Sequence, residues 1–114
     1  MTGRIFVIDR VVTEPGRARE FVASYTSEYV PGGRARGMTL AHILVSPPIW
    51  LDDDSNTVTA TWTVDNVAAW WDMTRMGRPD PTLGEWWNRV DELIVERSRS
   101  MAAPTEDVEV LCNV

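Results

Sequence analysis

The stretch from Asn56 to Trp71 reads NTVTATWTVDNVAAWW, and it decides the fold of this chain. Apolar residues alternate with threonines from Thr57 to Val64, and this period of two predicts a strand with one apolar face and one hydroxyl-lined face. Asp65 follows as a candidate helix N-cap, and apolar residues at helical spacing then lead to Trp70 and Trp71. The sequence therefore predicts a strand that runs directly into a helix.

Similar patterns predict the elements on either side of this stretch. The expected elements are a strand over 4–13, a helix that begins after Pro15-Gly16 and ends at Pro31-Gly32-Gly33, a strand over 38–46, a helix that begins at Asp80-Pro81 and ends at Met101-Ala-Ala-Pro104, and a last strand over 108–112. This order is typical of the α+β ferredoxin-like βαββαβ fold, with a four-stranded antiparallel sheet and helices on one face. Two copies that pack sheet against sheet would bury the uncovered face.

Composition narrows the classes of function. We expect one domain over 1–114, since 114 residues with 44% hydrophobic content suffice for one core. The net charge of −6 argues against nucleic-acid and anionic-membrane partners, and the absence of lysine excludes Schiff-base chemistry. Cys112 is the only cysteine, so an intrachain disulfide is excluded. No apolar run reaches the length of about 20 residues that spans a bilayer. A cytoplasmic protein is expected.

Adjacent charges interrupt the first strand. Asp9 and Arg10 are neighbours in an extended segment, so their side chains point to opposite faces of the sheet and one of them faces a buried side. Either this charge sits in a salt bridge or at the end of the sheet, or it projects into a cavity and takes part in chemistry.

His42 is the only histidine, and imidazole is the side chain whose ordinary pKa lies near neutral pH. In a regular strand His42 shares a face with Leu40 and Leu44. If that face looks toward the helices, His42 would share the wall of a cleft with Trp62 and could transfer a proton. The alternative is a histidine satisfied in the core or in an interface.

The remaining candidates are aromatic or acidic side chains near that wall. Tyr25 and Tyr29 lie on the apolar stripe of the first helix, and Trp62 and Trp70 flank the central turn. Each of these four either packs the core or the dimer interface or contacts a ligand. Asp72, with Asp9, Arg10 and Tyr25, is a possible polar partner for His42. The sequence contains neither a Gly-rich phosphate loop nor a metal-ligand cluster, so neither a cofactor nor a metal is expected.

Several of these features together resemble a known superfamily. The turn Glu14-Pro15-Gly16, a first helix with Phe21 and two tyrosines, Thr61-Trp62-Thr63 and the Trp86-Trp87 helix are similar to the dimeric α/β-barrel superfamily, in particular its NIPSNAP-like and antibiotic-biosynthesis-monooxygenase-like branch. The resemblance implies a homodimeric α/β barrel with a ligand cleft between sheet and helices in each subunit. The haem-degrading members carry a histidine in the helix after the strand tryptophan. Residues 67–74 contain none, so haem is not expected unless His42 supplies the ligand from a different wall.

The resemblance and the candidate residues support two hypotheses. In the first, the chain is a small cofactor-independent enzyme, namely an isomerase, cyclase or monooxygenase, that acts on a hydrophobic, aromatic or polyketide-like molecule by proton transfer. His42, Asp9 and Arg10 are then the catalytic candidates, and Trp62, Tyr25, Tyr29, Trp70 and Asp72 the substrate-binding candidates. In the second, it is a non-catalytic small-molecule-binding or structural homodimer.

Overall fold

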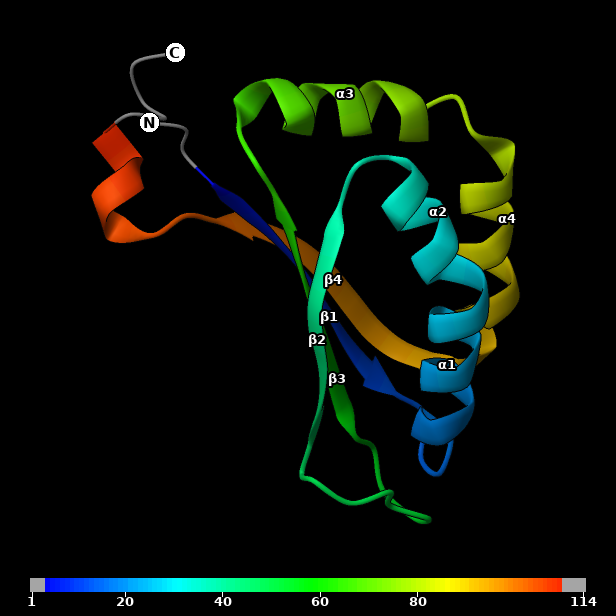
Figure 1. Cartoon of the computed structure of the whole chain (residues 1–114). Coiled ribbons are helices and arrows are strands. Elements are labelled where there is room, and N and C mark those ends of the chain that lie inside the picture. Colours follow the sequence, from blue (N-terminus) through cyan, green and yellow to red (C-terminus); the bar gives the residue numbers. More distant parts are fainter. Residues whose placement is uncertain (1–3, 110–114) are drawn as a thin grey trace.

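The computed structural model describes residues 4–109, and Figure 1 shows a sheet with helices packed on one side of it. In chain order the elements are β1 (Ile5–Thr13), α1 (Ala18–Ser24), the π-helical segment η1 (Tyr25–Tyr29), α2 (Val30–Ala35), β2 (Thr39–Ser46), β3 (Thr57–Val64), α3 (Val67–Gly77), α4 (Pro81–Val90), the 3-10 turn η2 (Asp91–Leu93), β4 (Ile94–Ala102) and the 3-10 turn η3 (Thr105–Asp107).

The four strands form one sheet in the order β2-β3-β1-β4, in which every neighbouring pair is antiparallel. The strands β1 and β2, which are separated by β3 in the sheet, therefore run parallel to each other. The helical segment from α1 to α2 connects them across one face of the sheet. The second helical segment, α3 with α4, returns the chain to the far edge at β4. This arrangement is the ferredoxin-like α+β fold that the sequence predicts.

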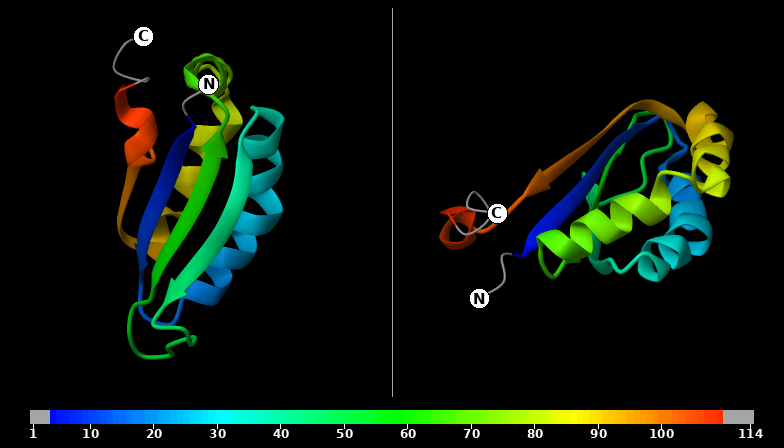
Figure 2. Two further views of the ribbon diagram at one scale, coloured as in Figure 1. Left: turned by 60° about the vertical axis from the view of Figure 1, so that its left-hand side comes forward. Right: turned by 90° about the horizontal axis from the view of Figure 1, so that it is seen from above.

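The two faces of the sheet differ in what covers them. Apolar residues of β3 and β1 face the helices. On β3 these are Val58, Ala60, Trp62 and Val64, each of which is at most 2% exposed. The threonines of β3 lie on the opposite face together with Phe6, Ile8 and Val12 of β1. Figure 2 (left) shows that face from the front, with the described helices behind the strands or beyond their ends. We call it the open face.

The first helix is longer than its sequence suggests. We expected Pro31-Gly32-Gly33 to end it, but α2 continues to Ala35. Proline lacks a backbone N–H and would disturb a regular α-helical turn. The π-helical segment η1 precedes it, with the Val30 N–H donating to the Tyr25 carbonyl, and this wider turn lets the helix pass the proline.

A glycine ends α2 instead. Gly37 has a φ of 92°, its N–H donates to the Arg34 carbonyl at 3.0 Å, and the Met38 N–H donates to the Gly33 carbonyl at 3.1 Å. This pair of bonds is the Schellman motif, which favours glycine at the left-handed position. The motif places Arg36 at the C-cap of the helix, where we had expected a loop.

The C-terminal third differs most from expectation. Residues 94–102 form β4, whereas we expected the helix that begins at Pro81 to continue through them; α4 ends at Val90. The segment IVERSRSMA also has a period of two, and its pairing with β1 over most of its length outweighs its helical spacing. The strand predicted over 108–112 is wrong at Val108, which lies in a helical turn, and residues 110–114 lie outside the described part.

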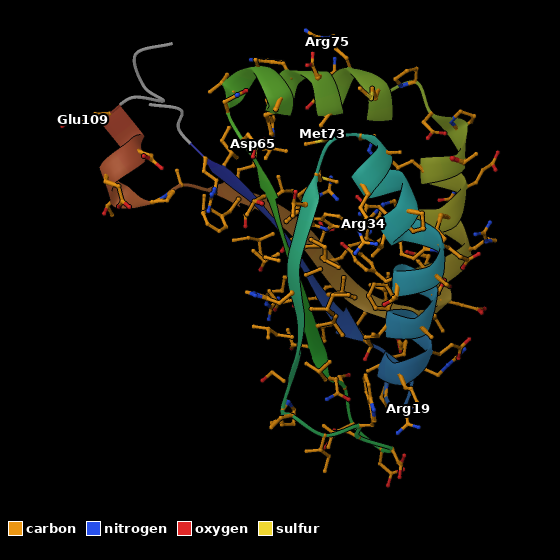
Figure 3. The ribbon with its side chains drawn as sticks, in the orientation of Figure 1. Arg19, Arg34, Asp65, Met73, Arg75 and Glu109 are labelled. Atoms are coloured by element: carbon orange, nitrogen blue, oxygen red, sulfur yellow. The ribbon has the colours of Figure 1, made fainter. Side chains whose placement is uncertain are left out.

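The caps of the two later helices give one confirmed and one corrected prediction. Asp80 caps α4 as expected, since its carboxylate accepts from the Thr82 N–H at 2.9 Å and Pro81 occupies the first turn. The cap of α3 is Asn66 rather than Asp65, because the Asn66 side chain accepts from the Ala69 N–H at 2.8 Å. Figure 3 shows Asp65 at the end of β3, just before this helix.

Candidate functional site

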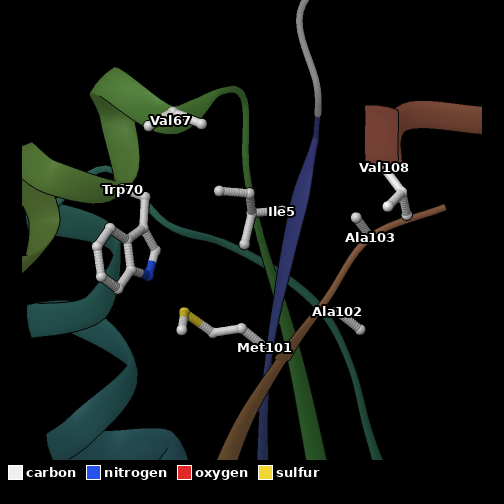
Figure 4. A pocket seen from close by; sticks show the side chains of 7 residues that line it. All are labelled: Ile5, Val67, Trp70, Met101, Ala102, Ala103 and Val108. Atoms are coloured by element: carbon white, nitrogen blue, oxygen red, sulfur yellow. The ribbon is translucent and has the colours of Figure 1, made fainter. Parts of the chain in front are cut away.

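A cleft opens between the helix-facing side of β1 and β4 and helix α3. Its outer part has a volume of about 360 Å³ and is lined only by apolar residues, among them Ile5, Val67, Trp70 and Met101. Figure 4 shows Trp70 descending from α3 toward Met101, with Val108 on the far side. Trp70 and Met101 thus form the two walls against which a flat apolar molecule could lie.

The inner part of the cleft is different in charge. It has a volume of about 340 Å³, shares Trp70 and Met101 with the outer part, and extends under α3 to Met73 and Gly77. Arg36, Arg78 and Arg99 line it, and its lining contains no aspartate or glutamate. The cleft is therefore apolar at its mouth and cationic at its inner end.

A buried polar cluster lies directly beside this inner end. Asp9 of β1 is 3% exposed and faces the helices, and Arg99 is its partner in the register of β4. The Arg99 guanidinium donates to the two Asp9 oxygens at 2.7 and 3.0 Å. The pairing accounts for the buried charge in β1, because a buried carboxylate is stable only when it is paired and hydrogen-bonded.

Tyr25 gives the Asp9 carboxylate a further hydrogen bond. Its hydroxyl donates to Asp9 Oδ2 at 2.8 Å and accepts from the Trp62 indole N–H at 2.7 Å. Burial, and next the negative charge of Asp9, raises the pKa of Tyr25 above its ordinary value. Tyr25 is consequently a neutral phenol at any physiological pH and acts as a structural link between β1 and β3.

Tyr29 connects the cluster to the cleft. Its hydroxyl accepts from Arg99 and, at 3.4 Å, from Arg36. Its ring stacks on that of Tyr25 with centroids 4.7 Å apart. Burial by itself lowers the pKa of Arg99, but the hydrogen bonds and charge of Asp9 outweigh it and raise that pKa above its ordinary value. Arg99 therefore stays charged where it lines the cleft.

The structure separates the predicted binding residues. Trp70 lines the cleft, and Trp71 beside it is 48% exposed, with its ring edge-on to that of Trp70 at a centroid distance of 4.8 Å. Tyr25 and Trp62 are at most 1% exposed and belong to the core, with Trp62 pressed so closely on α2 that a Cβ at Gly33 would lie 2.7 Å from its ring. Tyr29 is 3% exposed beneath Arg36. Asp72 is exposed and pairs with Arg75 along α3.

The catalytic candidates lie on both sides of the sheet. Asp9 faces the cluster, whereas Arg10 is exposed on the open face and pairs with Glu96 at 3.4 Å. His42 is exposed and pairs with Thr61, because a bulge between Leu40 and His42 shifts the register of β2. His42 therefore does not share the wall of a cleft with Trp62, which faces the helices. Its catalytic role stays a prediction.

Two functional candidates were missed by sequence reasoning. Arg36 fell between the predicted first helix and the strand over 38–46, and Arg99 fell within the predicted helix that begins at Asp80-Pro81, so neither was considered for the cleft. The alternation of Arg97, Arg99 and Met101 with Glu96 and two serines was the available signal for Arg99. Among residues 4–109, no three histidine, cysteine, aspartate or glutamate side chains are placed to hold a metal ion together. No helix in this range is long and apolar enough to cross a membrane.

The chain is similar in fold to several solved structures. A NIPSNAP-like domain protein from Burkholderia xenovorans superimposes with a TM-score of 0.70 at 16% identity, over 90% of this chain and 85% of that one. A NIPSNAP family protein from Agrobacterium tumefaciens gives 0.71 at 14% identity, over 93% and 90%. At these identities the likeness shows the fold alone.

A further solved structure extends the comparison to the second branch named above. A protein from Bordetella bronchiseptica that is provisionally assigned as an antibiotic biosynthesis monooxygenase superimposes with a TM-score of 0.60 at 21% identity, over 91% of this chain and 99% of that one. No protein-family model matches the sequence, and no curated protein is significantly similar to it. The predicted resemblance to this superfamily is therefore confirmed for the fold.

Proposed function

We propose that this protein binds a hydrophobic small molecule in the cleft between β1, β4 and α3. The observation that carries the proposal is the lining of the outer part, which is apolar throughout and includes the flat indole of Trp70. A concave apolar site with a few polar groups at one end is typical of small-molecule sites. The aromatic wall favours a flat, aromatic ligand.

Removal of the Trp70 ring tests the proposal. Native mass spectrometry of the purified chain should show a retained small molecule, or one taken up from a panel of aromatic compounds. Trp70→Ala should lose this mass, because the ring forms one wall of the cleft. Trp50→Ala is the matched control and should keep it, because Trp50 is 37% exposed and lies outside the lining of the cleft. Retention by both variants would place the ligand elsewhere.

A second candidate is catalysis on the same ligand. The likeness to the Bordetella bronchiseptica protein favours it, and the reaction would be that of a cofactor-independent isomerase, cyclase or monooxygenase. His42→Ala tests the proton-transfer role predicted for this residue. Loss of turnover without loss of stability would support the role, although His42 lies on the open face. Unchanged turnover on an established substrate would restrict the chemistry to the cleft side of the sheet.

We propose in addition that two copies pack through their open faces. Half-buried Phe6, Ile8 and Val12 lie there, and Leu44 of β2 on the same face is 54% exposed. An apolar face of this kind is normally covered by a partner. A second copy is the occupant that the superfamily fold suggests, and Arg10, Glu96 and His42 would then lie in or near the interface.

A further inference from the structure

We infer that the ligand of the cleft is an anion, specifically an apolar organic acid whose carboxylate binds Arg36 at the inner end. This inference rests on the proposed binding function and specifies the chemistry of the ligand. Trp70 and Met101 would hold the apolar body of the acid, and Arg36 would hold its charged end.

The burial of Arg36 is the first argument. Arg36 is 7% exposed and lines the inner part of the cleft, yet it takes part in none of the ion pairs formed among residues 4–109. Among these residues, the one hydrogen-bond partner of its guanidinium is the Tyr29 hydroxyl at 3.4 Å. Burying a guanidinium without an anion is costly, and the cost is offset when a ligand supplies the anion.

The two other arginines at the inner end, Arg78 and Arg99, do not supply an anion for Arg36. Arg99 already donates to both oxygens of Asp9, so its charge is balanced within the chain. Arg78 is exposed and adds positive charge at the rim of the inner part. The chain as a whole carries a net charge of −6. A cavity lined by arginines without an acid is thus a local reversal of charge, which favours an anion there.

The two acids that line a second cavity with Arg36 are already engaged. Glu28 and Asp80 line a small cavity of about 50 Å³ on the α4 side of Arg36. Glu28 accepts from Ser24 and pairs with Arg89 at 3.1 Å, whereas Asp80 accepts from Thr82 as the cap of α4. The bond from Thr82 is the main cause that lowers the pKa of Asp80, and the charge of Arg36 contributes least. Neither acid forms an ion pair with Arg36.

The position of the Arg36 side chain suits a fixed carboxylate site. Gly32 and Gly77 leave room for it, since a Cβ at these positions would lie 3.3 and 3.4 Å from Arg36 atoms. Its guanidinium carbon lies 5.6 Å from the centre of the Tyr29 ring, which holds the planar group on an aromatic surface. A pre-positioned guanidinium matches the two oxygens of a carboxylate.

A pair of probes that differ only in charge tests the inference. 2-Naphthoic acid and 2-naphthamide have nearly the same shape, but only the acid carries a negative charge at neutral pH. Isothermal titration calorimetry of the whole chain should show at least about tenfold tighter binding of the acid, as expected for a charge-assisted hydrogen bond. In Arg36→Met this preference should be lost, while binding of the amide stays as in the wild type.

Two further variants complete the design. Arg75→Met removes the same charge from the exposed face of α3 and should keep the preference for the acid. Arg36→Lys keeps the charge, so it should keep a weaker preference even if Arg36→Met fails to fold. Equal binding of both probes to the wild type would overturn the anion inference and leave the binding function intact. Binding of neither probe would overturn both, and an unchanged preference in Arg36→Met would remove Arg36 from the site.

Discussion

Asp9 holds the polar cluster beside the cleft, because Arg99 and Tyr25 both donate to it. We predict that Asp9→Asn lowers the free energy of unfolding by about 2 kcal/mol, less than for a fully buried pair because the Arg99 side chain is 37% exposed. Urea unfolding monitored by circular dichroism measures this change. Arg10→Gln is the control and should stay within about 0.5 kcal/mol, since the ion pair of Arg10 is exposed. Equal losses in both variants would contradict the role of the cluster.

The tyrosine pair offers a test by titration. The chain contains two tyrosines, so Tyr29→Phe leaves Tyr25 as the only source of phenolate absorbance. Because burial and Asp9 raise the pKa of Tyr25, its phenolate should not form near pH 10 in the folded variant and should appear there in denaturant.

The same shift sets the sign of a pH dependence. Below about pH 10 Tyr25 is protonated in both states, so its effect on stability is constant; above that pH only the unfolded state ionises, and stability falls as pH rises. Phenolate absorbance near pH 10 in the folded Tyr29→Phe variant would contradict the burial of Tyr25 beside Asp9.

At the scale of elements, the turn between β3 and α3 is held by one side chain. Asn66 accepts from the Ala69 N–H, whereas Asp65 before it is exposed. We predict that Asn66→Ala lowers the free energy of unfolding by about 1 kcal/mol through loss of the cap, and that Asp65→Ala changes it by less than half as much. Thermal and urea unfolding of the two variants measure the difference. A larger loss in Asp65→Ala would restore the cap that the sequence suggested.

The elements that sequence reasoning identified are those with a strong local pattern. The β3 strand alternates cleanly, Asp80-Pro81 predicts a helix start, and the stripe with Phe21, Tyr25 and Tyr29 marks one helix. From these, the α+β class and most of the order follow. The end of α4 does not, because residues 94–102 fit a helix and a strand alike and only pairing with β1 selects the strand.

The candidate site follows from the sequence only in part, for the same reason. For Trp70 the sequence left open packing and ligand contact, and the structure places this residue in the lining of the cleft. Arg36 and Arg99 come from the two regions where the elements were misassigned, namely the end of α2 and β4. The side of the sheet that His42 faces depends on the bulge between Leu40 and His42. The one extra residue in this bulge moves the His42 side chain to the opposite face, and the sequence carries no strong signal for it.

At the scale of the whole molecule, the open face decides whether the chain works as one copy or two. Leu44 on this face and Met76 on the outside of α3 are 54% and 53% exposed, so the two positions match in accessibility. If two copies pack sheet to sheet, Leu44→Asp places two carboxylates in an apolar interface, whereas Met76→Asp leaves them in water. Both variants should fold alike, because neither side chain is buried within one chain.

Size-exclusion chromatography with multi-angle light scattering distinguishes the outcomes. We predict a dimer for the wild type and for Met76→Asp, and a shift of at least tenfold in the dimer dissociation constant toward monomer for Leu44→Asp. A shift of this size corresponds to about 1.4 kcal/mol, well within the cost of burying an unpaired charge. A dimer that persists in Leu44→Asp would place the interface on another surface, and a monomeric wild type would leave Phe6, Ile8 and Leu44 as an apolar face that needs a different partner.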